Sequence, residues 1–217
     1  MTIDPRKVQE LQDLRARVQE LERELEADDT VAQWPPKGFY AEYYATTGFI
    51  LGMFGAATSL LMNVIGAPIA GKSPLELIRI YLTFPLGEKA LQLASGGKDV
   101  YAIGDGVILA MGCCLYLGTG MLLGVPFFVS LVWLTEGKST IYRLLIATIL
   151  SVLLWVVNFW GILSWLQPLL FNGNWITDPA LLPAWVALVT HLVFGWTLAL
   201  LYPWTKFQAY QQPELPV

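Results

Sequence analysis

Four long apolar runs dominate the chain after residue 43. They cover residues 44–70, about 106–134, a third run that begins at residue 142, and 183–203. A helix needs about 20 mostly apolar residues to cross the roughly 30 Å hydrocarbon core of a bilayer, and each run is long enough. Lipid offers the backbone no hydrogen-bonding partner, and no run alternates strictly as a membrane β-strand does. The pattern predicts an all-α membrane protein with four transmembrane helices.

A different pattern occupies the first 30 residues, where apolar side chains recur at alternating steps of three and four. These positions are Leu11, Leu14, Val18, Leu21 and Leu25. The spacing is that of the a/d seam of a coiled coil. In a parallel pair of such helices, Glu10 would face Arg15 and Arg17 would face Glu22, and both pairs attract. The sequence therefore predicts a coiled-coil-like N-terminal helix that docks on a partner through its apolar seam.

An alternative for the same segment is a solvated amphipathic helix that supports itself with intrahelical ion pairs, such as Asp13 with Arg17. A helix of this length is marginal alone in water, so its apolar stripe still needs a cover. Either a second copy of the chain or a different subunit would provide it.

The connection after the first apolar run predicts one more helix. Ser73-Pro74-Leu75-Glu76 is a capping box with proline at the first helical position. The apolar residues that follow are too few to cross a bilayer, so we expect a short interfacial helix at residues 74–94.

The predicted elements define the domain organisation. Residues 1–30 form the docking helix, 31–43 the linker to the membrane, 44–205 the transmembrane bundle and 206–217 a tail. Lys and Arg occur in the N-terminal arm, between the second and third runs and in the tail, but not in residues 167–182. We expect a multi-pass protein of the bacterial inner membrane, and the positive-inside rule places both of its termini in the cytoplasm. Four basic residues in the first connection are an exception, because this orientation puts them outside.

Composition narrows the classes of function. Of the 217 residues, 55% are hydrophobic and 14% charged, against about 25% charged in an average soluble chain. A net charge of −4 without a basic stripe argues against nucleic acid as a partner. Cys113 and Cys114 are adjacent in an apolar run, which suits neither a mutual disulfide nor a metal site.

Polar residues inside membrane helices are costly, so they are the first place to look for a site. The runs offer Asn63, Asn158 and His191, the only histidine of the chain. A mid-membrane imidazole can bind haem iron or chlorophyll magnesium, and a methionine or a partner chain could supply a second haem ligand. The alternative is that the ring hydrogen-bonds a neighbouring helix. The sequence itself requires no cofactor.

Small residues recur at helical spacing in three of the four runs. They are Gly48, Gly52 and Ala56; Gly112, Gly120 and Gly124; and Ala187, Gly195 and Ala199. Such faces allow two helix backbones to approach closely in lipid. The pattern predicts tight helix packing, either within the bundle or against other membrane subunits.

The stretches "DGVILAMGCCLYLGTGMLLGVPFF" and "THLVFGWTLALLYP" resemble small multi-pass bacterial membrane proteins of unknown function. Their last helix carries a His-x-x-x-Gly step, which is His191 and Gly195 here. The resemblance covers the membrane body and implies no catalytic residues.

Together these patterns favour a non-catalytic accessory subunit of a multi-subunit inner-membrane assembly, with a respiratory electron-transfer complex as the expected class. One alternative is a subunit that binds haem or chlorophyll through His191. Another is a homo-oligomeric transporter or channel, although polar pore-lining residues are few. We do not expect an enzyme, because the sequence has no grouped nucleophile, acid–base pair or metal cluster.

Overall fold

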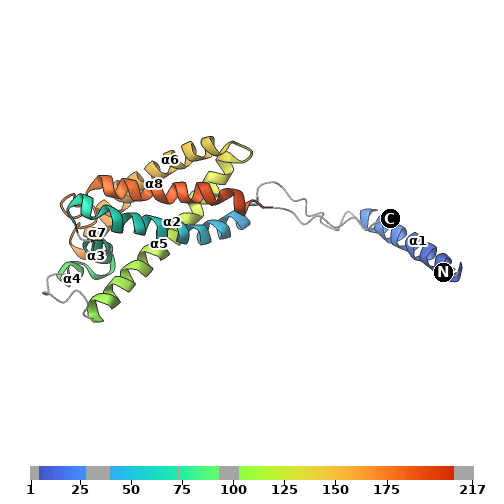
Figure 1. The fold of residues 1–217 in the computed structure, drawn as a ribbon, viewed down its shortest axis with the longest axis horizontal. Helices are drawn as coiled ribbons and strands as arrows, with labels where there is room; N and C mark the ends of the chain where they lie inside the picture. Colours follow the sequence, from blue (N-terminus) through green and yellow to red (C-terminus); the bar gives the residue numbers. More distant parts are fainter. Residues whose placement is uncertain (1–4, 28–39, 73, 93–102, 208–217) are drawn as a thin grey trace. The chain divides into compact units, whose positions relative to one another are not determined.

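The computed structural model describes residues 5–27, 40–72, 74–92 and 103–207 (Figure 1). The chain divides into two units, residues 1–37 and 38–217, and each is described by itself. The described part of the first unit is one helix, α1 (Pro5–Ala27). It begins at the proline that suits the first turn of a helix, where a missing N–H costs nothing.

The second unit is helical throughout its described residues. In chain order its elements are α2 (Ala41–Gly66), the 3₁₀ turn η1 (Pro68–Ala70), α3 (Pro74–Leu86), α4 (Lys89–Gln92), α5 (Ile103–Thr135), α6 (Thr140–Val156), the π-helix η2 (Val157–Leu163), α7 (Ser164–Phe171), α8 (Ala184–Leu201) and the 3₁₀ turn η3 (Tyr202–Thr205).

Four helical segments of this unit are long and apolar enough to cross a membrane. They are Ala41–Gly66, Leu109–Thr135, Thr140–Phe171 and Ala184–Thr205. The predicted all-helical class is therefore confirmed for the described residues, and these four segments are the candidate spans. The third span is continuous through α6, η2 and α7.

The chain enters and leaves the bundle at the same end (Figure 1). The backbone N–H of Phe207 donates to the hydroxyl of Tyr44 over 3.2 Å, and the ring of Phe207 packs on Tyr40 and Tyr43. The first and last spans therefore begin and end side by side.

Helices α2 and α5 approach each other through glycine. A Cβ added to Gly48 would lie 2.6 Å from the carbonyl oxygen of Gly124, and one added to Gly120 would collide with the Cβ of Ala56. Close contact of this kind needs residues without side chains, because packing rather than hydrophobicity associates helices in lipid.

The remaining small residues are also covered within the chain. A Cβ on Gly112 would lie 2.8 Å from Ile78 of α3, and one on Gly195 would lie 2.7 Å from Phe127 of α5. Ala187 and Ala199 of α8 are buried. The small-residue faces therefore pack inside this bundle, and a partner that used them would have to displace one of its helices.

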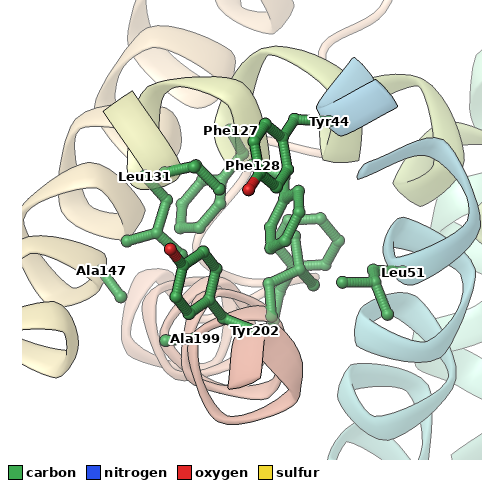
Figure 2. Close-up of a cluster of buried hydrophobic side chains, with 11 residues drawn as sticks. Tyr44, Leu51, Phe127, Phe128, Leu131, Ala147, Ala199 and Tyr202 are labelled. Carbon is green, nitrogen blue, oxygen red and sulfur yellow. The ribbon is translucent and has the colours of Figure 1, made fainter. Parts of the chain in front are cut away.

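Two clusters of buried apolar side chains fill the bundle. The first lies at the end where the chain enters and leaves, and is built on Tyr44, Phe128 and Tyr202 (Figure 2). Beside it the guanidinium of Arg143 lies 3.9 Å from the centre of the Tyr202 ring. Arg143 is one of the basic residues between the second and third apolar runs, yet the structure buries it.

The second cluster lies where α3 and α7 cover the other end of the bundle (Figure 1). The interfacial helix predicted at 74–94 is two helices, α3 and α4, with Gly87 in the left-handed region between them. Ile78 and Leu82 share one face of α3 and Ile80 lies on the other, and all three are at most 5% exposed. Protein therefore covers two opposite sides of α3 at these residues, whereas a helix lying flat on a membrane would bury one face.

A buried glutamine holds this end together. The side-chain amide of Gln167 in α7 donates to the Thr83 hydroxyl of α3 over 2.9 Å. Its oxygen accepts hydrogen bonds from the backbone N–H groups of Trp175 (2.8 Å) and Ile176 (2.9 Å). One side chain thus joins α3, α7 and the loop that leads to α8.

The third span widens into a π-helix at η2. The N–H of Ser164 bonds the carbonyl of Phe159, five residues back, as a π-helix requires. The carbonyl of Trp160, which that N–H would bond in an α-helix, instead accepts from the Ser164 hydroxyl over 2.7 Å. The indole of Trp165 donates to the Gly161 carbonyl over 2.6 Å. The side chains of Ser164 and Trp165 therefore satisfy the backbone carbonyls of Trp160 and Gly161 at the widened turn. Such π-helical turns occur frequently at functional sites.

Candidate functional site

The predicted docking seam is an exposed apolar stripe along α1. Its described side chains are Leu11, Leu14, Val18 and Leu21, with exposed fractions of 51%, 59%, 52% and 44%. We call these four residues the α1 seam. Leu25 belongs to the same predicted set, and its side chain lies outside the described part of the chain. The helix thus presents its apolar face with no cover from within the described part of its own unit.

The charged side chains of α1 make one intrahelical ion pair among the described residues. Arg17 bonds Glu20 over 2.6 Å, three positions along the helix, rather than Asp13 as the self-supporting alternative suggested. Both side chains are more than half exposed, and a pair in water of this kind adds little to stability. The ion pair does not remove the need to cover the seam.

A second candidate site is a cavity of about 270 Å³ inside the bundle. All four spans and α3 contribute to its wall, which is mostly apolar and contains no charged side chain. Phe194 comes from the first apolar cluster and Phe159 and Ile176 from the second, so the cavity lies between the two. Thr119 of α5 and Ile162 of η2 both line it and are both exposed, so the cavity opens on that side.

The π-helix forms much of one wall. Asn158, Phe159, Ile162 and Leu163 of η2 all line the cavity. A π-turn has more residues per turn than an α-turn, so it changes the direction of the side chains that follow. The widened turn therefore aims four side chains of the third span at the cavity.

His191 of α8 forms part of the polar wall. Its Nδ1 lies 2.7 Å from the carbonyl oxygen of Ala187, one turn earlier in the same helix. A carbonyl oxygen only accepts, so Nδ1 carries the proton and the neutral ring keeps a free lone pair on Nε2. Among the described residues, Nδ1 of the ring therefore bonds its own helix rather than a neighbouring one.

Two tyrosines complete the polar wall. Tyr81 of α3 and Tyr116 of α5 line the cavity and pack edge to face, with ring centres 4.8 Å apart. Burial raises the pKa of Tyr81, and the neighbouring Asn63, Tyr116 and Thr190 oppose that rise. The Tyr81 hydroxyl therefore stays protonated at neutral pH.

Asn63 of α2 adjoins this wall behind Tyr81. It is 1% exposed, and neither atom of its amide has a hydrogen-bond partner among the described residues. The amide nevertheless interacts with the Tyr81 hydroxyl of α3, the neighbouring helix. Buried polar groups are nearly always satisfied, and the Tyr81 hydroxyl is a partner for this amide across α2 and α3.

Sequence reasoning selected His191, Asn63 and Asn158, and the structure brings all three to or beside one cavity. It missed Tyr81 and Gln167. The signal for Tyr81 was weak, because a tyrosine in a short amphipathic segment suits the membrane interface equally well. Gln167 lies in a stretch that the sequence places in an outer loop, and only the fold shows that its side chain is buried.

The size of the cavity bears on the cofactor alternative. An engineered cavity of about 150 Å³ holds one benzene molecule, so 270 Å³ suits one or two six-membered rings. A haem or chlorophyll bound by His191 stays a prediction, and most of its macrocycle would have to lie outside this cavity.

The chain matches no family model, and no curated protein or solved structure is significantly similar to it. The resemblance to small multi-pass bacterial proteins stays a prediction. The class that the fold defines is an all-helical membrane protein with four candidate spans and a separate N-terminal helix.

Proposed function

We propose that this protein is a non-catalytic subunit of a multi-subunit assembly in the bacterial inner membrane, and that α1 joins it to that assembly. The observation that carries the proposal is the exposure of the α1 seam, where four apolar side chains in register are 44–59% exposed. Burying one leucine side chain stabilises a complex by about 1.5–3 kcal/mol. A stripe of this kind on a helix too short to be stable alone is typical of a docking element.

The partner that fits the α1 seam is a second copy of the same helix. Valine at an a position with leucine at d positions favours two parallel strands, and Val18 lies between Leu14 and Leu21 in that register. Two of the three charge pairs beside the seam would attract, since Glu10 would face Arg15 and Arg17 would face Glu22 of the other copy, while Glu24 would face Asp29 and repel it.

Membrane insertion favours the same parallel arrangement. Two copies inserted in the same orientation carry α1 on the same side of the membrane. The C-terminal end of each α1 leads into its own bundle, so the two helices can run side by side without either chain reversing.

The bundle narrows the choice of docking surface. Its small-residue faces are already covered by its own helices, so they do not compete with the α1 seam for partners. Association through α1 leaves the interior of the bundle unchanged.

Two finer parts of the proposal rest on the sequence. The distribution of Lys and Arg supports cytoplasmic termini. Membership of a respiratory electron-transfer complex stays a prediction, with no structural observation behind it.

Native mass spectrometry of the full chain, released from lipid nanodiscs wide enough for several copies, tests the pairing of α1 with a second copy. We expect a mass of about 48 kDa, twice the 24.1 kDa of one chain. A single-chain mass at micromolar protein would contradict self-association through α1.

A further inference from the structure

The cavity described above has the chemistry of a ligand site that is separate from the α1 seam. Ligand sites are concave and mostly apolar, with a few polar groups that fix orientation. This cavity has apolar and aromatic walls, and its polar groups include His191, Tyr81 and Tyr116. Helices from all four spans meet there, so the site exists only in the folded bundle.

The walls define the charge and solubility of the ligand. None of the side chains that line the cavity is Asp, Glu, Lys or Arg. An ionised ligand would leave its charge unpaired in an apolar site, at a large cost in free energy. The ligand is therefore neutral. The opening beside Thr119 and Ile162 lies along the spans, so such a molecule would enter from the lipid.

The polar groups define what the ligand must carry. The Nδ1–H of His191 donates to a carbonyl of its own helix. In the neutral ring Nε2 is then an acceptor that can take a hydrogen bond from a ligand. The amide of Asn63 lies beside the same wall, next to the Tyr81 hydroxyl. A ligand hydroxyl is the group that satisfies an imidazole lone pair without introducing charge.

The volume and the aromatic side chains define its shape. A cavity of about 270 Å³ holds one or two six-membered rings by comparison with the benzene-sized cavity of about 150 Å³. Phe159 packs edge to face on His191, with ring centres 6.1 Å apart, and aromatic rings prefer such arrangements with one another.

We propose that the cavity binds a neutral, membrane-soluble molecule with a hydroxylated ring, and that the hydroxyl donates a hydrogen bond to Nε2 of His191. The π-helix η2 shapes the wall beside His191 through Phe159, and Tyr81 and Tyr116 add further polar groups. This site is independent of whether α1 pairs with a second copy.

The experiment uses 4-pentylphenol as the probe and pentylbenzene, which lacks the hydroxyl, as its matched control. The full chain is labelled with ¹⁵N-histidine in nanodiscs, and because the chain has one histidine the spectrum reports His191 alone. We expect saturable binding of 4-pentylphenol with a shift of the Nε2 signal. Pentylbenzene should bind at least about tenfold more weakly and leave Nε2 unmoved.

Two variants separate binding in the cavity from partition into lipid. His191→Phe keeps a ring and removes the acceptor, so the tenfold preference for the phenol should disappear. Thr119→Trp blocks the opening from an exposed position and should abolish saturable binding. Its control is Leu122→Trp, at a 67% exposed position of α5 outside the cavity wall, which should bind as the unaltered chain does.

The proposal is overturned if both probes only partition into the bilayer without saturation. It is also overturned if 4-pentylphenol saturates while Nε2 stays unmoved, or if Thr119→Trp binds as tightly as Leu122→Trp. Because Thr119 and Leu122 both face outward, these variants keep the test decisive even where His191→Phe fails to fold.

Discussion

At the scale of single residues, the bundle depends on positions where no side chain is tolerated. Gly48, Gly52, Gly120 and Gly124 bring the backbones of α2 and α5 into direct contact. The absence of a Cβ is the property that matters there, because added atoms in a packed interior force the backbones apart.

Replacing Gly120 by alanine should destabilise the bundle by about 1–3 kcal/mol, because the new methyl group would collide with Ala56 of α2. Gly118→Ala is the matched control two residues away, where an added Cβ meets nothing within 4 Å. Thermal unfolding in mild detergent measures both. Equal melting temperatures for the two variants would refute the close approach of α2 and α5.

Gln167 supports a second residue-scale prediction. Gln167→Met keeps the volume but removes the bonds to Trp175 and Ile176, which leaves buried backbone donors unpaired at a cost of about 1–3 kcal/mol each. Hydrogen exchange of the 172–183 loop should become at least about tenfold faster, while α8 serves as the internal control. Unchanged protection of the loop would show that Gln167 does not hold it.

The sequence predicted some of these residues and not others for a physical reason. Glycines at helical spacing indicate close approach, but the spacing carries no information about which helix approaches. His191 stood out as an ionisable group in an apolar run. Its bond to Ala187 depends on the rotamer of the ring, which composition does not encode.

At the scale of elements, apolar length was sufficient to predict the four spans. It was not sufficient to predict η2, because a π-helix has the same apolar composition as the α-helix around it and differs only in hydrogen bonding. The interfacial position predicted for α3 followed from its length, whereas its burial depends on α7 and on the loop held by Gln167.

The α1 seam supports the element-scale prediction. Leu14→Asp combined with Leu21→Asp places four charges in the proposed two-stranded core. Each lost leucine removes about 1.5–3 kcal/mol of burial, so dissociation should become at least about 100-fold easier. Gln12→Asp with Gln19→Asp adds the same charge at exposed positions off the seam and should leave association within a few-fold. Sedimentation of the full chain in detergent measures both.

Equal weakening by the two pairs of substitutions would mean that charge, rather than burial of the seam, controls association.

At the scale of the whole molecule, the four spans of the second unit return the chain to the side from which it came. Tyr44 and Phe207 meet at that end, while the loop before α8 lies at the other (Figure 1). The arrangement of the ends follows from an even number of crossings and holds whichever side is cytoplasmic.

Single cysteines in a chain without Cys113 and Cys114 test this topology. Glu136→Cys and Lys206→Cys are exposed at one end and Ala180→Cys at the other. In intact cells, an impermeant maleimide should label Ala180→Cys and spare the other two until the membrane is opened. Labelling of Lys206→Cys and Ala180→Cys from the same side would contradict four crossings.

Cysteine cross-linking at the α1 seam in native membranes tests the central claim most directly. In the same cysteine-free chain, Leu14→Cys is compared with Ala16→Cys, which lies on the opposite, exposed face of α1. The account predicts that mild oxidation converts Leu14→Cys into a disulfide-linked pair of identical chains and leaves Ala16→Cys largely single. A Leu14→Cys chain that stays single, or that links no more readily than Ala16→Cys, would contradict it.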